Sequence, residues 1–126
     1  SQNVRGFRWN LRGPDLFALR QTFEVMYTEL HAMTDEVAER IRTLDARPLQ
    51  GFDEVLKTSD VPAVKDVAQG SEAMRHCVAA YSVLLVRERA LMQLARQSHD
   101  EGSAAMLGRL IASHEKQVWL CRASLV

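Results

Sequence analysis

The sequence has few of the residues that interrupt regular structure. Its 126 residues include only three prolines and six glycines. Excess charge is also missing, because 16 basic and 16 acidic residues balance. A neutral chain has no global field to attract nucleic acid, so DNA binding would need a local patch or a tail. These residues contain no basic tail.

Long apolar runs and cysteines are scarce as well. No run approaches the roughly 20 residues of a membrane-spanning helix, and no signal peptide is visible at Ser1. We therefore expect a cytoplasmic protein with no membrane partner. The two cysteines, Cys77 and Cys121, lack metal-site spacing, which predicts reduced core residues rather than a disulfide or reactive thiols.

Helical periodicity fills the stretches between these few prolines and glycines, and no alternating strand pattern occurs. The spacing predicts a long helix over 15–44, begun by Pro14 or Asp15, a second over 71–97 and a third from Gly102 to about 125. Residues 2–11 are predicted to end a further helix whose first half is missing. Residues 51–59 are predicted to form a short helix in the long connection.

Four long helices with one long connection predict an all-α, ferritin-like four-helix bundle in a single domain, residues 1–126, with the short helix between the second and third helices. The predicted seam of helix 15–44 has positions three or four apart: Leu16, Leu19, Phe23, Met26, Leu30, Met33, Val37 and Leu44. The other two helices are predicted to turn these residues inward: Met74, Val78, Tyr81, Leu85, Met92, Leu107, Leu110, His114, Val118, Cys121 and Leu125. His114 is predicted to be a hydrogen-bonded core histidine.

A second, polar stripe runs along helix 15–44, about 140° from the seam at helical spacing. Its members are Arg20, Glu24, His31, Asp35 and Glu39. One interpretation is a solvated face with ion pairs such as Arg20 with Glu24. The other is a face toward a partner subunit that holds metal, since carboxylates with histidine in a helical bundle are typical di-iron ligands. The spacing leaves both open.

Four segments resemble the Dps family, the DNA-binding proteins from starved cells, which are ferritin-like miniferritins. They are RGFRWNLRGPDLFALRQTFE (5–24), DEVAERIRTL (35–44), DEGSAAML (100–107) and EKQVWLCRASL (115–125). The resemblance extends over essentially the whole chain, in the right order. It implies a hollow dodecamer that oxidises ferrous iron, often with peroxide, and stores the ferric mineral. Many members also coat DNA through a basic tail.

The family's ferroxidase centre lies between two subunits. Its motif is His-Trp-Asn, a second His twelve residues on and an acid four later, facing an Asp-x-x-x-Glu of the other subunit. In this sequence Trp9 and Asn10 match, and Arg8 and Arg20 stand at both histidine positions. The matching acids are Glu24, Asp35 and Glu39.

Arginine is a poor metal ligand, because its guanidinium stays protonated and has no acceptor atom. We therefore expect a degenerate centre in which Arg8 and Arg20 form inter-subunit salt bridges to Asp35 and Glu39. No catalytic residue is expected, and ferroxidase activity should be absent or weak. Weak residual binding of iron by Glu24, Asp35 and Glu39, with His31 nearby, stays open, as does iron held as a stored mineral.

Asp100 and Glu101 lie where the family has its iron pore, but they suit a helix cap equally well. The leading hypothesis is therefore a cage subunit for iron storage and stress protection, which could co-assemble with a histidine-bearing family member. One alternative is an active ferroxidase with a shifted site. Another is a DNA-compacting, nucleoid-associated structural protein.

Overall fold

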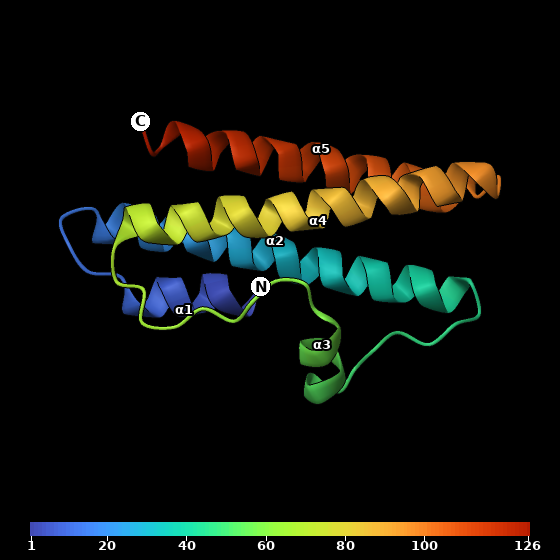
Figure 1. Ribbon diagram of the computed structural model, residues 1–126, viewed down its shortest axis with the longest axis horizontal. Coiled ribbons are helices and arrows are strands. Elements are labelled where there is room, and N and C mark those ends of the chain that lie inside the picture. Colours follow the sequence, from blue (N-terminus) through green and yellow to red (C-terminus); the bar gives the residue numbers. More distant parts are fainter. The chain divides into compact units, whose positions relative to one another are not determined.

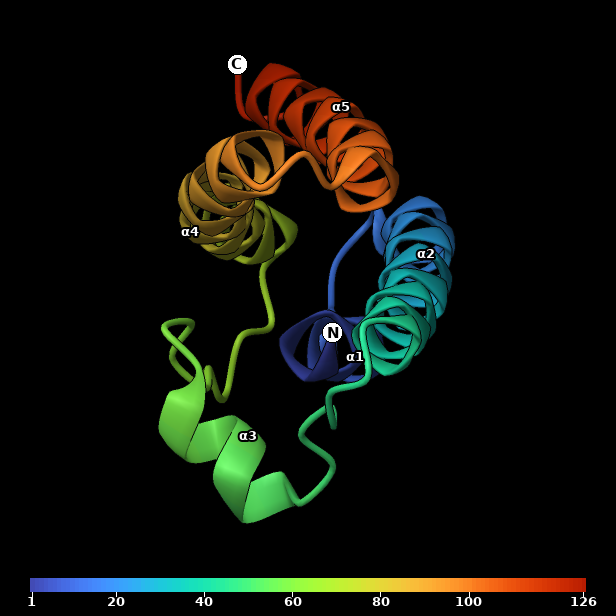
Figure 2. The ribbon, with the colours of Figure 1, turned by 90° about the vertical axis from the view of Figure 1, so that its right-hand side faces the viewer.

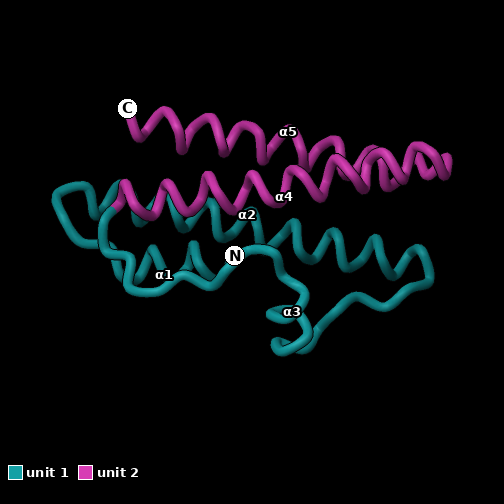
Figure 3. The backbone as a smooth tube through the Cα atoms, viewed as in Figure 1, with its two compact units in different colours: residues 1–69 teal, residues 70–126 magenta.

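The computed structural model describes residues 1–126, which form five helices and no strand (Figure 1). The helices are α1 (Gln2–Asn10), α2 (Leu16–Thr43), α3 (Phe52–Thr58), α4 (Gly70–Gln97) and α5 (Glu101–Ala123). The predicted all-α class is confirmed. The backbone divides into two compact units, residues 1–69 and residues 70–126 (Figure 3). None of the helices has the length and apolar character needed to cross a membrane.

The first unit is built on the hairpin of α1 and α2. Phe7 of α1 and Phe23 of α2 are buried and meet edge to face, with ring centroids 5.8 Å apart. Edge-to-face contact is a favoured arrangement of aromatic rings and adds to the burial of their surface. Gly13 makes the turn between the helices with φ +111°, a conformation that side chains disfavour. The two helices therefore run antiparallel, with one aromatic contact near their centre.

The segment after α3 is held against α1 by hydrogen bonds. The side chain of Asn3 donates to the Pro62 carbonyl at 2.9 Å and accepts from the Val64 N–H at 3.1 Å. The Arg12 N–H donates to the Ala68 carbonyl at 2.9 Å. These contacts join segments about sixty residues apart in the chain and fix the end of the long connection.

The second unit is the hairpin of α4 and α5, which lie side by side (Figures 1 and 2). Most predicted inward positions are buried: Met74, Tyr81, Leu85, Leu107, Leu110, His114, Val118 and Cys121. Val78 and Met92 are only half-buried. The three- and four-residue spacing therefore identified the inner faces of both helices.

Both α2 and α4 end in a left-handed residue that is not glycine. Asp45 has φ +62° and His99 has φ +55°. After α4, the Asp100 N–H donates to the Ala95 carbonyl at 2.8 Å and the His99 N–H donates to the Arg96 carbonyl at 3.1 Å, which is the Schellman pattern. The same pattern follows α2 at Asp45, so a sequence poor in glycine still ends its long helices sharply.

Two details at the ends of the predicted helices were wrong. Leu44 is not a seam residue, because α2 ends at Thr43 and Leu44 is its C-cap, 53% exposed. The last helix ends at Ala123, and its C-cap is Ser124, whereas the prediction carried it to about 125. The last turn of a helix frays. Side chains there are exposed where no facing helix covers them.

Candidate functional site

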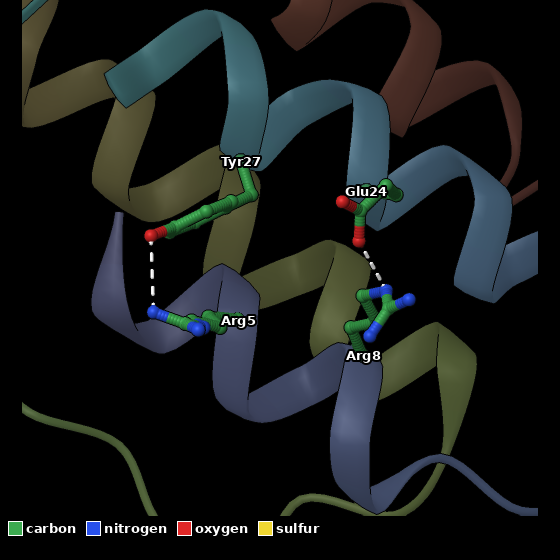
Figure 4. A network of polar contacts seen from close by, with 4 residues as sticks. All are labelled: Arg5, Arg8, Glu24 and Tyr27. Atoms are coloured by element: carbon green, nitrogen blue, oxygen red, sulfur yellow. Dashed lines mark hydrogen bonds and ion pairs between the residues drawn. The ribbon is translucent and has the colours of Figure 1, made fainter.

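Arg8 and Glu24 form an ion pair across the α1–α2 hairpin (Figure 4). Both side chains are half-buried. The pairing follows from the antiparallel packing, which places the end of α1 beside the first half of α2. Glu24 therefore has its cation, Arg8, within its own chain.

Arg5 lies one turn before Arg8 in α1 and contacts aromatic rings. Its guanidinium donates to the Tyr27 hydroxyl at 3.1 Å (Figure 4) and lies 5.1 Å from the ring centroids of both Trp9 and Tyr27. Tyr27 in turn stacks on His31, with centroids 5.5 Å apart. The sequence reasoning missed this cluster. Its one local signal was the spacing of four residues between Arg5 and Trp9, which puts both on one face of a helix.

The remaining charges of the α2 stripe are exposed. Arg20, Asp35 and Glu39 have no hydrogen bond or ion pair of their side chains within the chain. The Arg20–Glu24 pair of the solvated-face interpretation is absent, because Glu24 binds Arg8 instead. His31 is exposed too, and its described contact is the stack on Tyr27. One face of α2 thus presents a cation near its start and two anions near its end.

No group of three or more histidine, cysteine, aspartate or glutamate side chains in the chain could hold a metal ion. The predicted ligands Glu24, Asp35 and Glu39 follow one another along a single helix, and the first of them is ion-paired to Arg8. The residues of one subunit therefore do not fit a di-iron centre. Any site made from them needs ligands from a second chain.

At the start of α5, Asp100 acts as the N-cap. Its carboxylate accepts the Ser103 N–H at 3.0 Å, which satisfies one of the free donors at the helix start. Glu101 lies in the first turn, where a negative charge suits the helix dipole. The capping interpretation of Asp100 is confirmed, and a pore lined by these two acids stays a prediction.

A buried polar cluster joins α4 and α5. His114, only 4% exposed, has its Nδ1 2.7 Å from Oε1 of Glu88, and its ring lies 5.2 Å from that of Tyr81. The second carboxylate oxygen of Glu88, Oε2, is buried without a hydrogen-bond partner. His114 is the partnered core histidine that the sequence predicted. Glu88 was missed, although it falls on the buried face at helical spacing from Tyr81 and Leu85.

Cys77 and Cys121 are both free and buried, as predicted. They lie on facing helices of the same hairpin. The hydrogen bond with Cys121, together with burial, raises the pKa of the Cys77 thiol well above its usual range. A thiol that stays protonated is a weak nucleophile and a poor metal ligand, so Cys77 belongs to the core.

Ferritin-like proteins are all-helical bundles whose carboxylate ligands lie on long helices, and this chain is all-helical with carboxylates along α2. The ferritin-like domain family matches residues 1–126, the whole of the chain. The chain therefore belongs to the ferritin-like family, and its relatives place it with the Dps proteins.

Two relatives and two solved structures illustrate this. A DNA protection during starvation protein of Porphyromonas gingivalis is 32% identical over 96% of this chain and 76% of its own length. An uncharacterized protein of Haemophilus influenzae is 37% identical over 97% and 76%.

The crystal structure of a Dps protein from Vibrio cholerae, described as a member of the ferritin-like diiron-carboxylate superfamily, matches with a TM-score of 0.98. It is 38% identical over 99% of this chain and 79% of that one. A Bacillus brevis Dps structure matches with a TM-score of 0.95 at 27% identity, over 99% of this chain and 84% of that one. The predicted ferritin-like bundle is thus confirmed.

Proposed function

We propose that this chain is the subunit of a Dps-type cage that sequesters iron and protects the cell under stress, and that arginine ion pairs replace metal in its inter-subunit centre. The family membership supports the storage role. The Arg8–Glu24 ion pair carries the second part, because it places a permanent cation on an acid that the Dps motif gives to iron.

The chemistry of the substituted site opposes ferrous iron. Three carboxylates with two neutral histidines would carry three negative charges, whereas Glu24, Asp35 and Glu39 with Arg8 and Arg20 carry one. Two nitrogen ligands are lost as well, and guanidinium donates hydrogen bonds but has no lone pair to offer a metal. Both effects lower the affinity for two divalent ions.

The free charges of α2 are self-complementary in an antiparallel pair of copies. Arg20 and Asp35 are equally far from a point between Tyr27 and Thr28. A two-fold axis there sets the Arg20 of each copy opposite the Asp35 of the other. Glu39 follows Asp35 by one turn of α2, so its carboxylate lies beside the Asp35 that faces this Arg20. The proposal thus gives partners to the three α2 charges that have none within their own chain.

The Arg8 guanidinium can serve both sides of this interface. Its Nε faces Glu24 of its own chain, and its two terminal nitrogens carry further donors. Forked hydrogen bonds to carboxylates are the characteristic geometry of arginine. In a homo-oligomer, expected as a dodecamer, ion pairs would then hold the subunit interface at the place where the motif of its relatives binds metal.

Ferrous oxidation by the purified, size-checked assembly tests the proposal. Wild type is compared with the Arg8→His/Arg20→His double variant, first with dioxygen and then with peroxide. We expect a slow wild type and a variant faster by at least about tenfold, since two restored imidazoles supply nitrogen ligands and remove two positive charges. Rapid oxidation by wild type would instead establish the alternative, a ferroxidase with a shifted site.

DNA protection is a second candidate, favoured by the name of the Porphyromonas gingivalis relative, a DNA protection during starvation protein. The chain is neutral and has no basic tail in these residues, so binding would depend on local arginines. A gel shift of the assembly over a range of salt concentrations tests it, because contacts to phosphate weaken steeply as salt rises. No shift even at low salt would exclude binding by this part of the protein.

Co-assembly with a histidine-bearing family member follows from the same interface. Asp35 and Glu39 are the acids that such a partner's centre would require. A mixed pair of subunits would therefore hold one centre with the partner's histidines and one with Arg8 and Arg20. Co-expression with distinct tags should yield cages that contain both chains. Separate cages would limit this subunit to homo-oligomers.

A further inference from the structure

Cys77 of α4 and Cys121 of α5 form a pair of thiols inside the second unit. They are 2% and 3% exposed, and their side chains share a hydrogen bond across the hairpin. A disulfide requires two sulfur atoms that approach from neighbouring backbones, and the hairpin has already brought these two into contact. The iron site proposed above uses neither cysteine, so the contact is a separate feature of the chain.

The antiparallel packing of α4 and α5 produces this contact. The start of α4 and the end of α5 lie at the same end of the hairpin (Figure 1). Cys77 lies about two turns into α4, and Cys121 lies just before the end of α5 at Ala123. The pair therefore joins the open end of the hairpin, opposite the tight turn that connects the two helices. A covalent link at this position would close a long loop, which is where a disulfide restrains the chain most.

The two thiols are not equivalent. The hydrogen bond with Cys121 and burial raise the pKa of Cys77 well above its usual range. The same hydrogen bond lowers the pKa of Cys121, against the opposing effect of burial. The Cys77 thiol is thus the donor, and the Cys121 sulfur accepts the proton's charge. Because the thiolate is the nucleophile, Cys121 is the sulfur that reacts first with an electrophile.

Cys121 also lies where the hairpin opens most easily. The last turn of a helix frays, and local opening at a helix end requires far less free energy than global unfolding. Val118, one turn before Cys121, lines a hollow at the surface together with Trp119 and Arg122. A molecule as small as hydrogen peroxide needs only a slight opening to reach this sulfur, whereas a peptide-sized oxidant needs a large one. The position therefore favours a small oxidant.

We propose that Cys77 and Cys121 are a peroxide-reactive pair, which a small hydroperoxide converts to a disulfide between α4 and α5 and which a thiol reductant restores. This activity goes beyond the proposed iron storage and needs no metal. It would consume one peroxide for each pair of thiols.

The reaction balances in two steps. The Cys121 thiolate attacks one oxygen of hydrogen peroxide, the O–O bond breaks, and a sulfenic acid forms as hydroxide leaves. This hydroxide takes up the proton that Cys121 lost on ionising and becomes water. The Cys77 sulfur then attacks the sulfenic sulfur, the S–O bond breaks, and the departing hydroxide leaves as water with the Cys77 proton. Two thiols are oxidised to one disulfide, and one peroxide is reduced to two waters.

Oxidation of Cys121 also removes what keeps Cys77 unreactive. The first cause of the raised pKa of Cys77 is its hydrogen bond with Cys121. A sulfenic acid is neutral when it forms, so it no longer offers a thiolate that holds this proton in place. Cys77 is therefore a core thiol while the pair is reduced and becomes a nucleophile after its partner has reacted.

Mass spectrometry of the purified protein tests the proposal. The protein is reduced, transferred to a buffer with a metal chelator and treated with hydrogen peroxide. We expect each chain to lose about two daltons, the mass of two hydrogens, and both thiols to disappear from a titration in denaturant. Dithiothreitol should restore them. Thiols that persist under peroxide concentrations that oxidise the urea-unfolded chain would overturn the proposal, as would a disulfide between two chains on a non-reducing gel.

Single serine variants separate the roles of the two sulfurs. Cys77→Ser keeps a hydroxyl donor beside Cys121, so it should form a sulfenic acid that dimedone labels, and no disulfide. Cys121→Ser should lose its thiol at least about tenfold more slowly, because the remaining thiol is buried and protonated. Circular dichroism checks that both variants are folded. Equal rates in the two variants would contradict the assignment of Cys121 as the sulfur that reacts first.

Oxidised glutathione is the control oxidant. It carries the same two-electron oxidising capacity as peroxide but is too large for a slight opening of the helix end, so the folded chain should gain no glutathione. A mixed disulfide on the folded chain would contradict the selection of a small oxidant. The outcomes are independent of the proposed function, because the chelator excludes iron and the two thiols belong to one chain.

Discussion

Two pairs of polar side chains join α4 to α5 at adjacent positions, and they differ chiefly in burial. Glu88 and His114 are almost wholly buried, while Arg89 and Glu115 are 2.8 Å apart and more than half exposed. Exposed pairs contribute about 0–1 kcal/mol. A buried group that loses its partner destabilises the fold by roughly 1–5 kcal/mol. The two pairs thus offer a matched comparison within one hairpin.

We expect Glu88→Ala to lower the free energy of unfolding by about 3 kcal/mol, because it leaves His114 buried beside a cavity. Arg89→Ala should lower it by less than about 1 kcal/mol. Urea unfolding followed by circular dichroism measures both. Equal effects of the two substitutions would show that the buried cluster adds no more than a surface pair.

The Cys77 thiol makes stability depend on alkaline pH. The hydrogen bond with Cys121 and burial raise its pKa above the ordinary value of 9.0, so the folded chain keeps a proton that the unfolded chain releases. The contribution of this proton to the free energy of unfolding is complete below pH 9 and is lost above it, by up to about 1.4 kcal/mol per pH unit. Above pH 9 the free energy of unfolding of wild type should therefore fall more steeply than that of Cys77→Ala. Parallel curves would contradict the raised pKa.

Single residues were predictable where the resemblance supplied their place, but their partners were not. The two arginines stand out in the sequence because the resemblance sets them against histidine positions of the family's motif, which stays a prediction. One of the two interpretations paired Glu24 with Arg20 one turn away, whereas Glu24 pairs with Arg8 of another helix. Local spacing limits which residues of one helix meet, whereas a contact between helices depends on the register of the hairpin.

Helices were predictable to within one or two residues, because their periodicity is long and strong. The expected ranges 15–44, 51–59 and 71–97 became Leu16–Thr43, Phe52–Thr58 and Gly70–Gln97. The sequence gives little indication of where these helices end. Asp45 and His99 adopt the left-handed backbone conformation after α2 and α4, a position where glycine is the usual residue. Glu88 escaped notice because carboxylates are rarely buried without a partner, and that partner lies on another helix.

The start of α5 separates two roles proposed for Asp100. Its carboxylate caps the helix by accepting the Ser103 N–H, and Asp100→Ala should lower the free energy of unfolding by about 1 kcal/mol. Asp100→Asn keeps an acceptor oxygen and removes the charge, so its stability should stay within a few tenths of a kcal/mol of wild type. Urea unfolding compares them.

The same Asp100→Asn variant then reports on the pore. If the carboxylate draws ferrous iron inward, iron uptake by the assembly should slow while stability holds. Unchanged uptake would leave Asp100 with the cap alone.

Some charges and apolar side chains have no partner within the chain. Arg20, Asp35 and Glu39 on α2 have no partner within the chain, and α3 has no covered face. Isolated exposed groups are ordinary on a protein surface. Here the unpaired charges of opposite sign are placed symmetrically about the middle of one helix, which is the arrangement that a two-fold interface requires.

A charge exchange tests this assembly most directly. Arg20→Glu alone puts an acid opposite Asp35 of the second copy, with Glu39 beside it, and Asp35→Arg alone puts a cation opposite Arg20. Each should raise the subunit concentration needed for assembly by at least about tenfold, since facing like charges repel. The double variant Arg20→Glu/Asp35→Arg restores opposite charges at the first of these contacts and should recover most of the loss in sedimentation experiments. A Lys116→Glu change at an exposed position of α5 controls for altered net charge. If the double variant assembles no better than the worse single one, these two residues do not face each other. The substituted arginines would then be surface charges rather than replacements for iron.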